Sequence, residues 1–419
     1  MTGEQYPSFL RIALFTETFL PKVDGIVTTL CQTLRQLRSL GHEVLIFAPD
    51  GGPAEFEGFR VVRVRGHAFP SYPELRLALP HASLGRILQE FRPDVIHAAE
   101  PALLGIAALY YGGGNHGGAL HVPLVVSYHT DLPKYLAYYG LRFLEPRIWR
   151  LLRLRHNRAA LNLCTSRIMA SQLEQHRIPR VALWPGGVDT DQFQPARRSA
   201  AMRSRLTGGH PDNPLLLYVG RLSAEKEIER ILPILDANPG ARLALVGGGP
   251  NRRALEHHFA GRPVEFTGFL RGDELAGAFA SSDVFVMPSR TETLGLVVLE
   301  AMASGLTVIG ARAGGIPEMI DDRVNGFLFD DEDRAADCVA RLLASPEERQ
   351  AVGRAARMHA LDWTWEKATL RLVEHYRAAR ELQQTAPNSR PSPEHPTLRL
   401  RARAALTSAT LFTIRKLLP

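Results

Sequence analysis

The stretch SRTETLGLVVLEAMASG, Ser289–Gly305, brings two acids, a glycine turn and a helix start into one short span. Glu292 precedes the apolar run that begins at Leu296, and Glu300 lies on the second turn of the helix that this run predicts. At ~1.5 Å rise per residue, the two carboxylates are roughly 12 Å apart along the axis. The paired acids of a glycoside hydrolase are closer, at ~5 to 9.5 Å, so this pair is not typical of one.

The same spacing suits the two ends of one extended ligand. Between the acids, the free N–H groups of the helix start can receive a phosphate. An acid, a phosphate site and a second acid match a nucleotide sugar, with sugar hydroxyls at one end and ribose at the other. The alternative interpretation is a buried amphipathic helix whose acids are solvated.

The size and composition of the chain limit its class. A chain of 419 residues is expected to form two domains, and 45% hydrophobic with 22% charged residues is typical of a globular protein. The cysteines Cys31, Cys164 and Cys338 are far apart, which favours a reducing compartment and disfavours structural zinc or a disulfide frame. No apolar run approaches the ~18 residues of a membrane span. A net charge of +7 favours anionic partners, which include nucleic acid, anionic lipid and phosphorylated substrates.

Short apolar runs separated by helical patterns predict an α/β fold with two doubly wound, Rossmann-like parallel sheets. The strands expected in the first sheet are 11–16, 44–48, 61–64, 94–97, 124–128 and 161–165. A segment rich in Gly, Pro and Asp follows, and the strands expected after it are 215–219, 243–246, 264–267, 284–287 and 308–309. Ligands bind beyond the carboxyl ends of such strands, so we expect a cleft between the two sheets.

This pattern divides the chain into four regions. We expect one Rossmann-like domain at 1–195 and a second at 196–362. The segment 363–384 has helical periodicity after the second domain is complete, and it is expected to pack back across the interface. A Pro-rich linker and a basic amphipathic tail occupy 385–419, for which a disordered tail is the alternative.

Two cations follow the first strand of the second domain. Arg221 and Lys226 come after Gly220, at the carboxyl end of the strand, where they can neutralise a leaving pyrophosphate. The alternative is a surface pair balanced by Glu225 and Glu227.

Two first-domain residues at strand ends are candidates for ligand contact. Gly25 lies in the first strand-to-helix loop, where a missing side chain lets the backbone approach a phosphate, although a turn glycine explains it equally well. His129 follows a buried strand and can contact a reacting sugar from the opposite wall, although a lone histidine is more often structural.

Two other motifs are weak. The glycines Gly247–Gly249 lack the third glycine of a dinucleotide fingerprint because Arg252 stands there, which disfavours an oxidoreductase. The acidic pairs Asp321–Asp322 and Asp330–Asp331 fall in predicted surface turns. We therefore expect no metal site and no cofactor other than the donor substrate.

An ordered set of motifs resembles the retaining family-4 glycosyltransferases of the GT-B fold. The set consists of KVDGIVTTL, SYHTDLP, GRLSAEK, FTGFL and the E-x7-E segment, and the match extends to about Leu382. More narrowly, HTDLPKYLAYYG, LWPGGVD, VFVMPSRTETLGLVVLEAMASG and GARAGGIPEMI resemble sulfoquinovosyltransferases, which transfer sulfoquinovose from UDP-sulfoquinovose to diacylglycerol. Transferases of mannose or glucose to lipids share much of this pattern.

The resemblance implies a role for each donor-binding position. Arg221 and Lys226 would hold the diphosphate, Gly25 would approach the pyrophosphate, and Glu300 would bind the ribose. The first domain would then be the acceptor side and the second the nucleotide-sugar side.

The transferred sugar and the base have their own contacts in this resemblance. His129 and Glu292 would lie by the sugar, and Phe269, within Thr267–Leu270, by the base. The backbone by the sugar and phosphate would be that of Thr293, Leu294 and Gly295. The family retains the anomeric configuration without an evident enzymic nucleophile, and the departing phosphate is thought to deprotonate the acceptor.

A sulfonate or a lipid needs further contacts. Arg312 and Lys134 are candidates for pairing with a buried sulfonate, and the alternative for both is a solvated surface. The arginine-rich segment 141–158 has an apolar stripe flanked by cations, which is typical of a helix at an anionic membrane but also of a core-packed helix with a basic face.

We therefore expect a cytoplasmic lipid glycosyltransferase, peripherally associated with the cytoplasmic face of a membrane. Its partners would be a nucleotide-sugar donor, a diacylglycerol-type acceptor and an anionic membrane surface, but no nucleic acid. A GDP-mannose or UDP-glucose donor is the alternative within the class. A non-catalytic nucleotide-sugar-binding protein is the alternative outside it.

Overall fold

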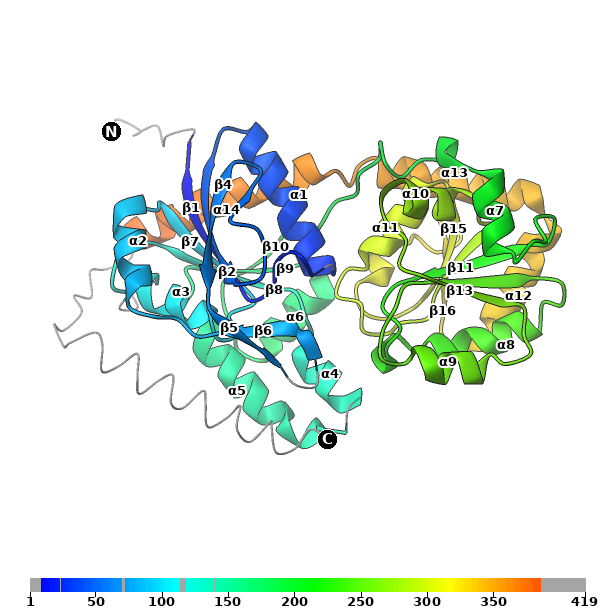
Figure 1. Ribbon diagram of the computed structural model, residues 1–419, viewed down its shortest axis with the longest axis horizontal. Coiled ribbons are helices and arrows are strands. Elements are labelled where there is room, and N and C mark those ends of the chain that lie inside the picture. Colours follow the sequence, from blue (N-terminus) through cyan, green and yellow to red (C-terminus); the bar gives the residue numbers. More distant parts are fainter. Residues whose placement is uncertain (1–8, 23, 70–71, 114–117, 139, 386–419) are drawn as a thin grey trace.

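The computed structural model describes residues 9–22, 24–69, 72–113, 118–138 and 140–385. Figure 1 shows two α/β domains side by side, the first coloured blue to cyan and the second green to yellow. Each domain has a central sheet with helices on both faces. The prediction of two doubly wound domains is therefore confirmed.

The first sheet has the strand order β10-β9-β8-β7-β1-β2-β4-β3. All neighbours are parallel except β3 and β4, which pair antiparallel. Its strands are β1 (Arg11–Thr16), β2 (Glu43–Pro49), β3 (Glu55–Phe56), β4 (Phe59–Val64), β7 (Val95–Ala99), β8 (Leu124–Tyr128), β9 (Leu161–Cys164) and β10 (Val181–Leu183). The central strands β7 and β8 are wholly buried, as expected for a parallel sheet that helices cover on both faces.

Helices follow the strands of this domain, as the crossover connections of a parallel sheet require. They are α1 (Gly25–Ser39), α2 (Ser83–Phe91), α3 (Gly105–Tyr111), α4 (Leu132–Tyr138), α5 (Glu145–His156) and α6 (Arg167–Gln175). A separate antiparallel ribbon consists of β5 (Gly66–Phe69) and β6 (Tyr72–Ala78).

The arginine-rich segment 141–158 does not form a single continuous α-helix. A 3-10 turn, η2 (Arg142–Leu144), precedes α5, and Pro146 lies in the first turn of α5, where a missing N–H costs nothing.

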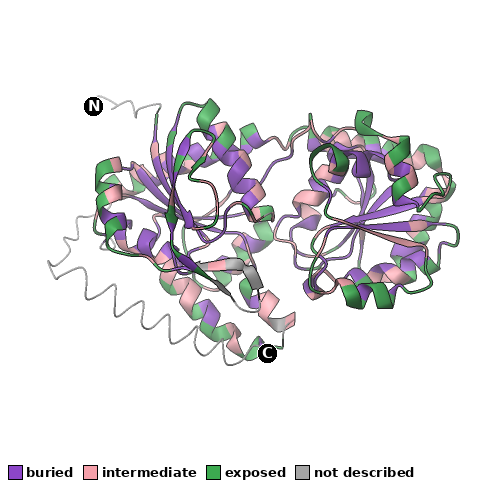
Figure 2. Cartoon of the chain, viewed as in Figure 1, coloured by how far each residue is buried: buried purple, intermediate pink, exposed green. Residues whose placement is uncertain are grey.

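The second sheet has the order β13-β12-β11-β14-β15-β16 and is parallel throughout. Its strands are β11 (Leu215–Val219), β12 (Arg242–Val246), β13 (Val264–Gly268), β14 (Val284–Met287), β15 (Thr307–Ala311) and β16 (Phe327–Phe329). The helices around it are α7 (Ala200–Leu206), α8 (Ile231–Asp236), α9 (Arg252–His258), α10 (Gly272–Ala280), α11 (Leu296–Ala303), α12 (Glu332–Ala344) and α13 (Pro346–Ala360). Figure 2 shows the buried strands in purple inside the greener outer helices.

The last described helix, α14 (Trp365–Thr385), returns to the first domain. It is drawn in orange in Figure 1, beside α1. Leu372, Val373 and Tyr376 of α14 are part of the first domain's hydrophobic core. The chain therefore crosses between the domains twice.

Among the described residues, no helix is both long and apolar enough to cross a lipid bilayer.

Candidate active site

Polar contacts join the carboxyl ends of first-domain strands to the loop before α11. The Thr293 hydroxyl donates to the His129 carbonyl oxygen over 2.8 Å. The Thr165 hydroxyl, just after β9, donates to the Thr293 carbonyl oxygen over 2.9 Å. Thr165 was not among the predicted site residues. Its position at the end of a predicted strand could have indicated that it belongs to the site. The loop 291–295 thus lies against the wall that carries His129.

The loop is shaped by glycines. Gly295 precedes α11 with φ +95°, in the left-handed region that favours glycine, and no side chain caps the helix. Behind the loop, the Gly315 N–H donates to the Glu292 carbonyl oxygen over 2.8 Å. A Cβ at Gly314 would lie 2.3 Å from that oxygen, and one at Gly315 would lie 2.4 Å from the Thr293 carbonyl oxygen. The run GARAGG therefore supports the loop through its two last glycines, a role that the sequence did not reveal.

Lys226 and Glu292 form a mostly buried ion pair. Nζ of Lys226 lies 2.6 Å from Oε1 of Glu292, and each side chain is 14% exposed. Lys226 ends the 3-10 turn η4 (Ala224–Lys226), which is fixed by a hydrogen bond from the Thr291 hydroxyl to the Glu225 carbonyl oxygen. Burial opposes the charge on Lys226, but the adjacent Glu292 carboxylate raises the pKa of the amine above its ordinary value. Lys226 is therefore a cation at any physiological pH.

Glu300 lies on α11, where burial raises the pKa of its carboxyl to about 7. A carboxyl with this pKa titrates in the range in which enzymes work. The Glu292 carboxylate is paired with Lys226, whereas burial alone is the cause of the shift at Glu300. The two acids of the opening stretch therefore differ in their electrostatic environments.

An exposed aromatic ring lies at the carboxyl end of β13. The Phe269 side chain is 66% exposed, and a Cβ at Gly248 would lie 2.6 Å from its ring. Cβ atoms at Gly247 and Gly249 would lie 2.0 Å and 2.3 Å from the carbonyl oxygens of Gly220 and Leu222. The glycine triplet therefore lets the neighbouring loops and the Phe269 ring pack closely, while most of the Phe269 side chain stays exposed.

Arg221 and Gly25 lie at the edges of the same region. Arg221 is exposed directly after β11 and Gly220, and its carbonyl oxygen accepts a hydrogen bond from the Tyr218 hydroxyl over 3.2 Å. Gly25 begins α1, and the atom nearest to a Cβ built there is Cδ1 of Leu296, 4.0 Å away. The first residue of α1 thus faces the first residue of α11 across the two domains.

His129 is buried on the first-domain wall. Its Nε2 lies 2.8 Å from the Ser127 hydroxyl. Its ring packs edge to face against the Trp184 ring, with the two ring centroids 5.5 Å apart. Burial lowers the pKa of His129 to about 4, so the imidazole is neutral at physiological pH.

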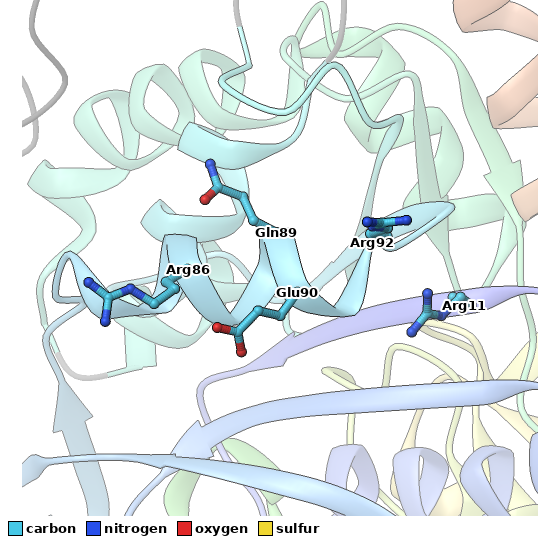
Figure 3. Close-up of a pocket in the computed structure, with 5 residues that line it drawn as sticks. All are labelled: Arg11, Arg86, Gln89, Glu90 and Arg92. Atoms are coloured by element: carbon cyan, nitrogen blue, oxygen red, sulfur yellow. The ribbon is translucent and has the colours of Figure 1, made fainter.

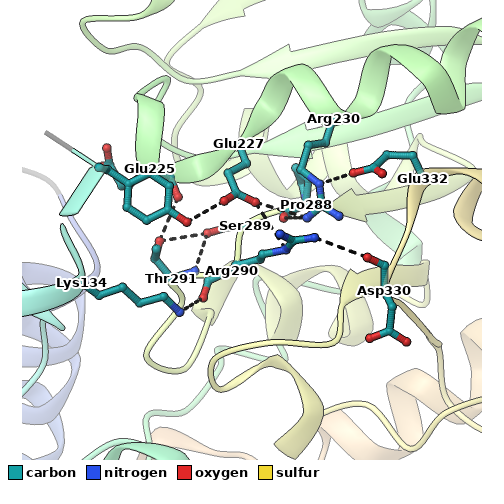
Figure 4. Close-up of polar contacts among 11 residues, drawn as sticks. Lys134, Glu225, Glu227, Arg230, Pro288, Ser289, Arg290, Thr291, Asp330 and Glu332 are labelled. Carbon is teal, nitrogen blue, oxygen red and sulfur yellow. Dashed lines mark hydrogen bonds and ion pairs between the residues drawn. The ribbon is translucent and has the colours of Figure 1, made fainter. Parts of the chain in front are cut away.

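The two sulfonate candidates are in different settings. Arg312 is ion-paired with Asp322 at 2.8 Å and with Asp330 at 3.3 Å, so its charge is already compensated. Nζ of Lys134, on α4, lies 2.5 Å from the Arg290 carbonyl oxygen of the second domain. Figure 4 shows this contact near the charged side chains of Glu227 and Arg230. The Glu227 carboxylate also accepts from the Tyr138 hydroxyl over 2.6 Å. The structure does not bring Arg312 and Lys134 together.

The described residues contain no group of three or more His, Cys, Asp or Glu side chains arranged to hold a metal. The acidic pair members Asp322 and Asp330 are bound by Arg312 instead. A hollow of about 430 Å³ lies elsewhere, beside the first residue of β1 and therefore at the opposite end of that strand from the candidate site (Figure 3). Its lining is Arg11, Arg86, Gln89, Glu90 and Arg92.

The chain matches two protein-family models. Glycosyltransferase Family 4 matches residues 23–192, and Glycosyl transferases group 1 matches residues 206–359. It is 41% identical to sulfoquinovosyl transferase SQD2 of Arabidopsis thaliana, over 88% of this chain and 74% of that protein. It is 39% identical to a GDP-mannose-dependent alpha-mannosyltransferase of Mycobacterium tuberculosis, over 88% of this chain and 97% of that protein.

Solved structures share the fold. Sucrose-phosphate synthase from Thermosynechococcus elongatus superposes with a TM-score of 0.72 at 21% identity, covering 88% of this chain and 98% of that one. HepE of Anabaena in complex with UDP-glucose superposes with a TM-score of 0.69 at 20% identity, covering 88% and 100%. With its two facing Rossmann-like domains and its matches to both family models, the chain belongs to the nucleotide-sugar glycosyltransferases of the GT-B fold.

Proposed function

We propose that this glycosyltransferase moves sulfoquinovose from UDP-sulfoquinovose to diacylglycerol, with retention at the anomeric carbon. The observation that carries the proposal is the Lys226–Glu292 pair at the start of α11, opposite His129. In this pair, a cation that can bind a diphosphate lies directly beside a carboxylate that can bind sugar hydroxyls. The similarity to the Arabidopsis sulfoquinovosyl transferase supports this donor.

A GDP-mannose donor is the second candidate. The similarity to the mycobacterial mannosyltransferase is nearly as high, at 39% against 41% identity. The two transferred sugars differ in charge, because only sulfoquinovose carries a sulfonate. A UDP-glucose donor and a non-catalytic nucleotide-sugar-binding protein are the remaining alternatives.

The proposed reaction relies on charge stabilisation and positioning. The bond from the anomeric carbon to the β-phosphate oxygen breaks, and Arg221 and Lys226 stabilise the negative charge that develops on the diphosphate. The acceptor oxygen bonds to the carbon on the face that the phosphate leaves, and its proton passes to the departing phosphate oxygen. Glu292 holds sugar hydroxyls during this step. Because two cations offset the diphosphate, we propose that no metal ion is required.

The direct test incubates the protein with diacylglycerol in mixed micelles and one donor at a time. UDP-sulfoquinovose should give a lipid product with the anomeric configuration of the donor, at a rate at least tenfold above that with UDP-glucose or GDP-mannose. EDTA should leave this rate largely unchanged. A faster reaction with GDP-mannose would replace the proposed donor, and binding of all donors without any transfer would favour a non-catalytic role.

Donor affinity should depend on pH through Glu300. Burial raises its pKa to about 7. In the proposed donor complex, the ionised carboxylate would accept hydrogen bonds from the ribose hydroxyls. At pH 6 only about a tenth of such a group is ionised, against about nine tenths at pH 8, so Kd for UDP-glucose should be about tenfold higher at pH 6. Calorimetric titration at both values measures this. Glu300→Gln should bind weakly at both, and an unchanged pH dependence in that variant would assign the titration to another group.

Lys134 is the better candidate for contacting the sulfonate, since Arg312 is held by two aspartates. Lys134→Gln should lower kcat/KM for UDP-sulfoquinovose about tenfold and leave that for UDP-glucose nearly unchanged, because only the first donor loses a charge partner. Arg312→Gln is the matched control and should affect both donors equally. Equal losses for both donors in Lys134→Gln would exclude Lys134 as the sulfonate contact.

The face of α5 and η2 is proposed to bind anionic membranes. Phe143 and Leu154 are 57% and 62% exposed, and the exposed arginines beside them are Arg142, Arg147 and Arg150. Arg155 does not belong to this face, because its guanidinium donates to the Pro101 carbonyl oxygen over 2.6 Å and burial lowers its pKa. The basic tail after Pro396, which we also expect to help in membrane binding, lies outside the described part of the chain.

Charge reversal tests this membrane surface. The triple substitution of Arg142, Arg147 and Arg150 by Glu should abolish cosedimentation with vesicles of phosphatidylglycerol at moderate salt, since each cation near such a surface contributes about 1 kcal/mol. Donor affinity should stay unchanged. The matched control reverses three exposed arginines of the second domain, Arg253, Arg334 and Arg354. If both triple variants lose binding equally, net charge rather than this face is responsible.

A further inference from the structure

A buried chain of hydrogen bonds runs from Tyr376 on α14 to His129, directly after β8. The Tyr376 hydroxyl lies 2.7 Å from Nδ1 of His97, and Nε2 of His97 lies 3.0 Å from the Ser127 hydroxyl. That hydroxyl lies 2.8 Å from Nε2 of His129. Tyr376, His97 and Ser127 are at most 1% exposed, and His129 is 8% exposed.

The direction of the protons in this chain follows from counting donors. Burial keeps both histidines neutral, so each ring has one N–H and one acceptor nitrogen. If His97 donated to Tyr376, the buried tyrosine O–H would have no acceptor among the described residues, which is costly. With Tyr376 donating to His97, the donors of Tyr376, His97 and Ser127 are all satisfied: His97 Nε2–H donates to Ser127, and Ser127 donates to His129.

We propose that Tyr376, through His97 and Ser127, holds the proton of His129 on Nδ1, so that His129 presents an N–H donor to an oxygen of the transferred sugar. The contact with the sugar rests on the proposed function, whereas the position of the proton does not. Within the described residues, Nδ1 of His129 makes no hydrogen bond of its own.

Two consequences follow for the reaction. His129 with its proton on Nδ1 and its Nε2 occupied by Ser127 cannot accept a proton from the acceptor hydroxyl, so it binds and orients the sugar. Ser127, His97 and Tyr376 are positioning residues, because they act through His129. Tyr376 belongs to α14, so the return of the chain to the first domain supplies the residue at the far end of the hydrogen-bond chain that orients His129.

Nitrogen-15 NMR of the histidine-labelled full chain tests the proton position directly. Two-bond ring correlations should show His129 in the Nδ1–H form and His97 in the Nε2–H form, with assignments from the loss of signals in His129→Gln and His97→Gln. The Nε2–H form of His129 in the wild type would overturn the proposal. This measurement needs no substrate, so it remains decisive if no sugar is transferred.

Variants test the chain link by link. Ser127→Ala and Tyr376→Phe should each convert a substantial fraction of His129 to the Nε2–H form. Thr369→Val is the matched control, since it removes another buried hydroxyl of α14 and should leave the form of His129 unchanged. An unchanged His129 in Tyr376→Phe, or an equal change in Thr369→Val, would exclude the role of Tyr376.

The contact with the sugar has its own readout. Saturating UDP-glucose should shift the His129 Nδ1–H resonance, and UDP alone should not. Ser127→Ala should lower kcat roughly three- to tenfold, the expected effect of one weakened hydrogen bond, with little change in the Kd of UDP. Equal shifts with UDP and UDP-glucose would show that His129 does not contact the sugar.

Discussion

Lys226→Ala should lower kcat for sugar transfer by about 10²-fold or more. The substitution removes a cation that is expected to stabilise the leaving diphosphate, and losing one such electrostatic contact typically costs about 10²- to 10³-fold. It also leaves the mostly buried Glu292 without its partner at 2.6 Å. Breaking a buried pair from one side costs about 3 to 5 kcal/mol, so the free energy of unfolding should fall as well.

A double substitution separates these two effects. Lys226→Met combined with Glu292→Gln leaves no unpaired charge, so it should regain most of the lost stability in denaturant titrations. It should not regain kcat, because the cation that Lys226 provides for the diphosphate is still missing. Recovery of kcat in the double variant would mean that Lys226 acts only by neutralising Glu292. A rise in donor KM alone, with kcat unchanged, would also contradict the leaving-group role.

The sheets were predictable because a parallel strand buried on both faces is a short continuous apolar run. β1, β8, β11 and β14 begin and end where the apolar pattern places them. The strands missed were β3, β5, β6, β10 and β16, which are short or lie at an edge or in a separate ribbon, and such strands carry weaker patterns.

The pairing of Lys226 was not predictable from its neighbours. In sequence, Glu225 and Glu227 are the nearest acids. In the structure, Glu225 accepts from the Ser223 hydroxyl at 2.5 Å and Glu227 from the Tyr138 hydroxyl, while Lys226 pairs with Glu292. Lys226 and Glu292 are 66 residues apart in sequence. They pair because two loops at the ends of strands pack together, and no local sequence pattern predicts that packing.

The supports of the site were hidden for the same reason. Gly314 and Gly315 lie in a run from which only Arg312 was singled out, yet Arg312 is bound by aspartates and the glycines touch the Glu292 loop. Arg155 likewise looked like one more membrane-facing cation, but it is directed to the Pro101 carbonyl oxygen. The residue types indicated which interactions these side chains can make. Which partners they contact depends on tertiary packing, which the sequence pattern does not show.

Arg221→Ala should also lower kcat by about 10²-fold, but without the loss of stability expected for Lys226→Ala. Arg221 is exposed at the carboxyl end of β11, so its removal takes no buried side chain out of the core. Its guanidinium can contact two phosphate oxygens at once, a geometry that lysine cannot reproduce. Arg221→Lys should therefore retain the charge and recover only part of kcat. The measurements are kcat, donor Kd and the midpoint of thermal unfolding for Arg221→Ala, Arg221→Lys and the exposed control Arg253→Ala.

The comparison of Kd with kcat decides what Arg221 does. If Arg221 stabilises charge that develops only as the diphosphate leaves, kcat falls far more than donor affinity does. If it binds the diphosphate equally before and during the reaction, donor Kd rises and kcat is unchanged, and the proposed leaving-group role of Arg221 is wrong. Full recovery of kcat in Arg221→Lys would show that charge alone matters, and that the two-oxygen contact does not contribute.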